Sequence, residues 1–95
     1  MGKILIIDDD TSVLRMIEDT LNHEGYTVFK AHSSREMFSL LDTVKPDLFL
    51  IDMSLPNTDG MTLCRRLRAS NDTSNTPIIF LTGHQSSYSV AEALE

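Results

Sequence analysis

The feature of this sequence that most limits its fold is a set of short apolar runs without polar alternation. They lie at 3–7 (KILII), 47–51 (DLFLI) and 78–81 (IIFL). Such runs are typical of parallel strands with helices on both faces, because neither face of the strand then meets water. Segments with helical spacing of apolar residues separate them. The alternation predicts βαβ units with right-handed crossovers, and therefore a doubly wound α/β fold.

The first helix is expected after the three aspartates at 8–10, with Thr11 or Ser12 as its cap and Gly25 at its end. The more polar segment 26–31 is predicted to be an edge strand, because Lys30 interrupts it.

Two further helices are expected before the strand at 78–81. Ser33 and Glu36 have the spacing of a capping box, and Pro46 is predicted to close that helix. The next helix should start near Asp59, bury Met61, Cys64 and Leu67, and turn Arg65, Arg66 and Arg68 to solvent. A last helix is expected after Ser86 or Ser87.

Length and charge narrow the functional classes. Ninety-five residues are enough for one domain, spanning 1–95. Eight basic against 14 acidic residues give a net charge of −6, which argues against direct nucleic-acid or anionic-membrane binding. One cysteine, no signal peptide and no apolar run of about 20 residues predict a soluble, cytoplasmic protein.

Polar residues follow the apolar runs at their carboxyl ends. Asp8 and Asp9 come after the first run, Asp52 after the second and Thr82 after the third. In a parallel sheet these ends share one edge, where ligands bind. Crowded carboxylates require neutralisation, and oxygen ligands suit Mg²⁺. A carboxylate beside such a metal can act as a nucleophile toward phosphorus. Taken singly, each residue could be a turn or cap residue; their coincidence at one edge favours a phosphoryl-transfer site.

Three segments carry a resemblance to a known family: ILIIDDD at 4–10, DLFLIDMSLPNTDGM at 47–61 and TPIIFLTG at 76–83. In this order the chain resembles the receiver domain of bacterial two-component response regulators. The resemblance implies a flavodoxin-like sheet with strand order 2-1-3-4 in this chain.

The resemblance also implies roles for individual residues. Asp52 would accept the phosphoryl group, and Thr82 would be the switch hydroxyl. Asp9 would bind Mg²⁺ directly, Asp8 would help through water, and the backbone carbonyl of Ser54 would complete the protein ligands. Pro56, Asp59 and Gly60 would shape the loop before the following helix.

The implied partner is a sensor histidine kinase or a phosphotransfer protein. The domain would be a regulator rather than an enzyme: it assists its own phosphorylation and dephosphorylation, then changes conformation to control an output.

The sequence departs from the family pattern at its end. The family lysine of a fifth strand has no counterpart, and the fifth strand and last helix are expected to be missing from the 95 residues. The strand at 78–81 is too apolar for an exposed edge, so self-association through it is expected.

Two other functions stay open. A haloacid-dehalogenase-like phosphatase would use Asp8 as nucleophile and Asp10 as acid/base, although Ser12 stands where that family has Thr or Val. The other open function is a receiver-like interaction module that is never phosphorylated.

Overall fold

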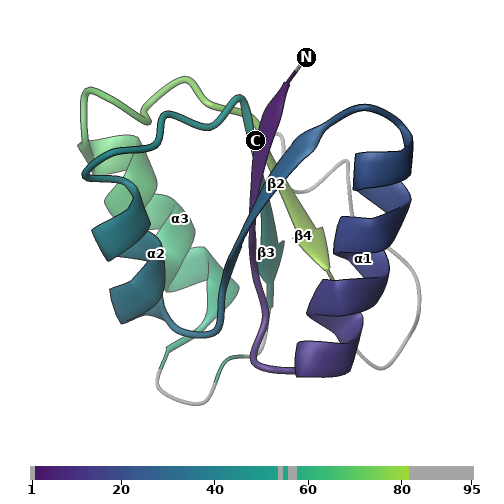
Figure 1. Cartoon of the computed structure of the whole chain (residues 1–95). Helices are drawn as coiled ribbons and strands as arrows, with labels where there is room; N and C mark the ends of the chain where they lie inside the picture. The colour runs from purple at the N-terminus through teal and green to yellow at the C-terminus, as the bar shows by residue number, and fades with distance from the viewer. Residues whose placement is uncertain (1, 54, 56–57, 82–95) are drawn as a thin grey trace.

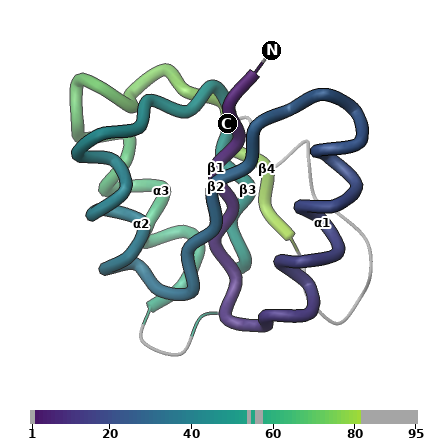
Figure 2. The backbone as a smooth tube through the Cα atoms, in the orientation of Figure 1, coloured from purple at the N-terminus to yellow at the C-terminus, as the bar shows by residue number. Residues whose placement is uncertain are grey.

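The computed structural model describes residues 2–53, 55 and 58–81, and within them a parallel sheet separates two helical layers (Figures 1 and 2). The strands lie in the order β2-β1-β3-β4. Their bounds are β1 Lys3–Ile7, β2 Thr27–Ala31, β3 Leu48–Asp52 and β4 Ile78–Leu81. Helix α1 (Thr11–His23) covers one face, and α2 (Ser34–Leu40) and α3 (Gly60–Ala69) cover the other. The predicted flavodoxin-like order and the edge position of β2 are confirmed.

The apolar strands have the two-sided burial that their composition predicts. Leu5 and Ile7 pack in the core under α2 and α3, whereas Ile4 and Ile6 pack with Leu14 under α1. Successive side chains of a strand point to opposite faces, so a strand with helices on both sides must be apolar at every position. Each such fully buried side chain contributes roughly 1.5–3 kcal/mol to folding.

The start of α1 differs from the prediction by one or two residues. Asp10 caps the helix, and its Oδ1 accepts the backbone N–H groups of Ser12 (2.9 Å) and Val13 (3.3 Å). Asp10 has extended backbone angles while Thr11 is already helical, so neither Thr11 nor Ser12 can be the cap. Gly25 has φ 97° beyond the helix end, as its predicted stop position requires.

Helix α2 begins as predicted and ends early. Ser33 accepts the N–H of Glu36 at 3.2 Å, but the Glu36 carboxylate accepts the N–H of His32 (2.7 Å) rather than that of Ser33. The helix stops at Leu40, and turns carry the chain to Pro46. Pro46 therefore does not close the helix as predicted.

Helix α3 has its cap at Asp59, and its buried face agrees with the prediction in part. Leu67 is buried as predicted and Cys64 is partly buried against the core, but Leu63 is buried and Met61 is 43% exposed. Buried Gly60 fixes the helix against the sheet, and positions three and seven residues later then face inward. Arg68 is half-buried rather than solvated: its Nη1 donates to the carbonyl oxygens of Thr73, Ser74 and Thr76 at 3.1, 3.2 and 2.7 Å.

The predicted last helix after Ser86 or Ser87 lies outside the described residues. In the part of the chain that the structure describes, no helix has both the length and the apolar character needed to cross a membrane.

Candidate functional site

Three carboxylates meet at the carboxyl edge of the sheet. Asp8 and Asp9 follow β1, and Asp52 is the last residue of the adjacent strand β3. One carboxylate oxygen from each of the three lies within 4.8 Å of the others. Asp8 and Asp52 are 5% and 6% exposed, whereas Asp9 is exposed. The predicted convergence of these three side chains is confirmed.

Backbone hydrogen bonds fix where these carboxylates lie. The N–H of Asp8 donates to the carbonyl of Ala31 at 3.1 Å, which extends the pairing of β1 with β2. Asp8 Oδ1 accepts the N–H of Asp10 at 2.9 Å. These backbone partners could not be predicted from the side-chain pattern.

Burial and like charge act together on Asp8. Its pKa rises to about 6, first because burial removes water from the carboxylate, and further because Asp52, Asp9 and Asp10 are negatively charged. The Asp10 N–H opposes this rise by donating to the carboxylate. At neutral pH the group is ionised at a cost, which a bound cation would remove.

The start of α3 lies directly against the end of β3. The N–H of Gly60 donates to the carbonyl of Met53 at 3.0 Å. A Cβ at Gly60 would lie 3.0 Å from the carbonyl oxygen of Asp52 and 3.1 Å from both Met53 Cα and Phe80 Cε1. Glycine is therefore required for this close approach, which determines how the chain leaves Asp52.

The donor set fits a hard divalent cation. Three carboxylates supply only oxygen, the ligand that Mg²⁺ prefers. Oxygens about 2.1 Å from one octahedral ion lie about 3–4 Å apart, so the observed spread needs only small side-chain adjustments. Asp8, Asp9 and Asp52 would hold such an ion and bring its charge to the edge of the sheet.

Two of the predicted site residues, Ser54 and Thr82, lie outside the described residues, as does Pro56 of the loop. Leu81, the residue before Thr82, pairs with Asp52, and its carbonyl accepts the N–H of Met53 at 3.0 Å.

Comparison with known proteins decides the family. The model of the response regulator receiver domain matches residues 4–95. The chain belongs to this family. Regulatory protein VanR of Enterococcus faecium is 41% identical over 81 residues, which cover 85% of this chain and 34% of VanR. Response regulator MprA of Mycobacterium ulcerans is 36% identical over 84 residues, 88% of this chain and 35% of MprA.

The chain thus spans about a third of the length of these curated relatives. Among solved structures, the chemotaxis response regulator CheY4 of Vibrio cholerae superposes with a TM-score of 0.83 at 30% identity, covering 90% of this chain and 72% of CheY4. Membership in the receiver family identifies a regulatory domain of phosphorylation-dependent signalling.

Proposed function

We propose that this receiver domain is a switch that accepts a phosphoryl group on Asp52 with the help of Mg²⁺. The observation that carries the proposal is the cluster of Asp8, Asp9 and Asp52 at the carboxyl edge of the sheet. Two of its members are buried, and the pKa of Asp8 is raised, so the cluster is costly without a cation.

In the proposed reaction a carboxylate oxygen of Asp52 attacks the phosphorus of a phosphohistidine on a kinase or phosphotransfer protein. The new O–P bond forms as the N–P bond breaks, and the histidine nitrogen keeps the electron pair. Asp8 and Asp9 hold the cation, with the Ser54 carbonyl as the further ligand that the family resemblance implies. When bound, Mg²⁺ neutralises the charge that the phosphoryl oxygens bring to the site.

The switch itself follows from the added charge. Phosphorylation replaces the single negative charge of the Asp52 carboxylate by the charge of about −1.5 to −2 on a phosphoryl group, beside two carboxylates that already repel one another. The Thr82 hydroxyl would donate to the new phosphoryl oxygens, which would shift the conformational population that an output partner recognises. We place this switch in the cytoplasm, as the single cysteine and the family suggest.

Two contacts favour this function over a phosphatase with Asp8 as nucleophile. Asp10, the acid/base in that mechanism, instead caps α1 through the N–H groups of Ser12 and Val13. Asp52 would have no task there, although it lies within 4.8 Å of the other two carboxylates. A silent interaction module is harder to reconcile with the cost of the cluster.

Intact mass spectrometry tests the proposal directly. The chain is incubated with acetyl phosphate and Mg²⁺, beside Asp52→Asn, the surface control Asp19→Asn and a sample with EDTA. We expect one added phosphoryl group on the unchanged chain and on Asp19→Asn, and none on Asp52→Asn or with EDTA.

The other outcomes discriminate between the alternatives. Phosphorylation that persists in Asp52→Asn would place the acceptor elsewhere. If it persists in Asp52→Asn but is lost in Asp8→Asn, the phosphatase is favoured. No phosphorylation of the folded chain, either by acetyl phosphate or by a phosphorylated histidine kinase, would support the silent module.

A further inference from the structure

We propose that Glu36 is a positioning residue for the cation site: through one peptide group, its carboxylate holds the backbone of the proposed cation ligand Asp8 in place. This role rests on the function proposed above, because it matters only where Asp8 binds a cation. The contact that points to it is a hydrogen bond that the capping-box spacing does not explain. The Glu36 carboxylate accepts the N–H of His32 at 2.7 Å, one residue before the Ser33 N–H that a capping box would use.

Two hydrogen bonds meet on the same peptide group. The C=O of Ala31 and the N–H of His32 belong to one planar unit, and in a trans peptide they point in opposite directions. The carbonyl accepts the N–H of Asp8 at 3.1 Å, and the N–H donates to Glu36. The peptide group is therefore held between the end of β1 on one side and α2 on the other.

The bond between Asp8 and Ala31 lies where the pairing of β1 with β2 stops. The last paired positions of the two strands are Ile7 and Ala31, so this bond has a neighbouring ladder bond on one side only. β2 is the outer strand of the described sheet, and support for its end comes from the helix instead. Asp8 Oδ1 in turn accepts the Asp10 N–H at 2.9 Å, so placing the Asp8 backbone also places its carboxylate.

The charge of Glu36 strengthens both bonds. A carboxylate makes shorter and stronger hydrogen bonds than a neutral acceptor, and 2.7 Å is typical of such a bond. It polarises the peptide group, which makes the Ala31 carbonyl a better acceptor for the Asp8 N–H. The same contact lowers the pKa of Glu36, first through the His32 N–H and then through the His32 side chain, so the carboxylate is ionised at neutral pH.

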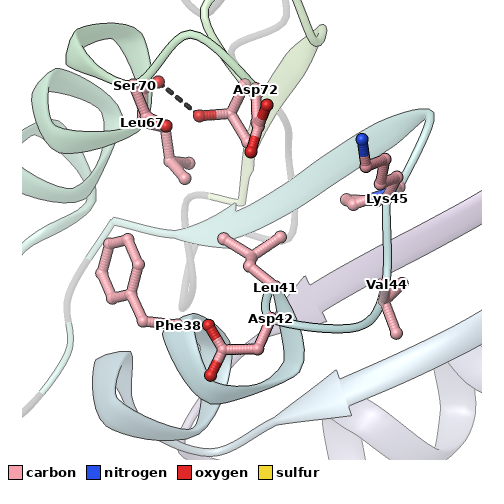
Figure 3. Close-up of a pocket in the computed structure, with 10 residues that line it drawn as sticks. Phe38, Leu41, Asp42, Val44, Lys45, Leu67, Ser70 and Asp72 are labelled. Atoms are coloured by element: carbon pink, nitrogen blue, oxygen red, sulfur yellow. Dashed lines mark hydrogen bonds between the residues drawn. The ribbon is translucent and has the colours of Figure 1, made fainter.

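Helix α2 is anchored by residues other than Glu36. The side chain of Met37 is fully buried in the core. Phe38 and Leu41 pack against the same core, on the side of α2 that faces α3 (Figure 3). The Glu36 carboxylate thus extends from a fixed helix, and its hydrogen bond restrains the peptide group at the end of β2.

NMR of the ¹⁵N,¹³C-labelled chain tests this role with and without Mg²⁺. The scalar coupling across the hydrogen bond from Asp8 to Ala31 reports its length in the folded state, whatever the fraction of molecules that is folded. We expect Glu36→Ala to reduce this coupling and to weaken Mg²⁺ binding, followed by amide titration, about three- to tenfold. A residue that bonds directly to the side chain of a metal ligand typically contributes roughly 10–100-fold, and Glu36 acts one step further away. Glu36→Gln keeps an acceptor without the charge and should restore the affinity to within about twofold.

Three controls separate the peptide contact from other effects. Ser33→Ala removes the hydroxyl that accepts the Glu36 N–H at 3.2 Å, so it weakens the helix start but keeps the carboxylate. His32→Ala removes the contact of the ring with Glu36 at 3.2 Å and keeps the backbone N–H. Glu24→Gln removes an exposed charge elsewhere. All three should keep the coupling and a Mg²⁺ affinity within about twofold of the unchanged chain, with folding checked by circular dichroism.

The outcomes separate this role from the proposed function. Unchanged coupling or unchanged Mg²⁺ affinity in folded Glu36→Ala would overturn the role of Glu36 and leave phosphorylation of Asp52 standing. A loss in Ser33→Ala or His32→Ala as large as that in Glu36→Ala would also overturn it, because the helix start or the ring would then be responsible. No Mg²⁺-dependent shifts at 8, 9 and 52 in the unchanged chain would overturn the proposed function and this role together.

Discussion

Replacing Asp8 by asparagine should stabilise the metal-free protein. The Asp8 carboxylate is 5% exposed, and its burial beside Asp52 and Asp9 raises its pKa to about 6. An asparagine has nearly the same shape, carries no charge and can still accept the Asp10 N–H through its Oδ1. The substitution therefore removes the cost of ionisation and keeps the hydrogen bond.

The magnitude follows from the pKa. A rise from 3.8 to about 6 corresponds to about 3 kcal/mol, since each tenfold change in proton affinity is worth about 1.4 kcal/mol. Below pH 3.8 both the folded and the unfolded state hold the proton, and the cost is absent. Between 3.8 and 6 only the folded state keeps the proton, so stability falls as pH rises, and above about 6 the full cost applies. The advantage of Asp8→Asn should therefore be about 1.5 kcal/mol at pH 5 and about 3 kcal/mol at pH 7.5.

Urea unfolding in EDTA, followed by far-ultraviolet circular dichroism because the chain has no tryptophan, measures this difference. The urea midpoint of Asp8→Asn should rise by about 1–3 M at pH 7.5 and by about half as much at pH 5. Asp19→Asn, an exposed control, should not shift it. Adding Mg²⁺ should stabilise the unchanged chain much more than Asp8→Asn. A variant no more stable than the parent at pH 7.5, or an advantage that does not depend on pH, would refute the argument.

Two further predictions concern the helix starts on either side of the site. Gly60→Ala should destabilise the chain by about 1–3 kcal/mol and slow phosphorylation of Asp52, because the new Cβ lies 3.0 Å from the Asp52 carbonyl oxygen. Urea unfolding measures the first effect and the rate of mass gain the second. An unchanged phosphorylation rate would contradict the role of Gly60 in positioning Asp52. Asp10→Ala should lower the free energy of unfolding by about 1 kcal/mol through loss of the α1 cap, whereas Asp10→Asn should change it little because asparagine also caps helices. Equal urea unfolding midpoints for the two variants would contradict the capping role.

The sheet and its carboxylate edge could be predicted because burial on two faces leaves a direct mark on the sequence. The runs at 4–7, 48–51 and 78–81, which lie in β1, β3 and β4, are apolar at every position, and a polar residue follows each run. The convergence of Asp8, Asp9 and Asp52 then follows from the parallel arrangement together with the adjacency of β1 and β3, which the family resemblance implied.

The details that the sequence did not predict depend on contacts between distant segments. The inward face of α3 is set by the close approach of Gly60 to Met53 and Phe80, so Leu63 is buried where Met61 was expected. The predicted and the observed faces share Leu67 and are similarly apolar, so only the contact with the sheet decides between Met61 and Leu63. The Arg68 side chain likewise leaves solvent because three carbonyl groups of the following loop converge on it.

The cost of the carboxylate cluster bears on the choice between a working switch and a silent module. Domains of this size are stable by about 5–15 kcal/mol, so a cost of about 3 kcal/mol at one buried aspartate is a large fraction of the total. Asparagine in place of Asp8 would remove this cost, because it has nearly the same shape, carries no charge and can still accept the Asp10 N–H. The cluster is therefore hard to explain by packing alone. A cation site beside Asp52 gives that cost a physical reason, because ionised carboxylates are what the cation and the phosphoryl transfer require.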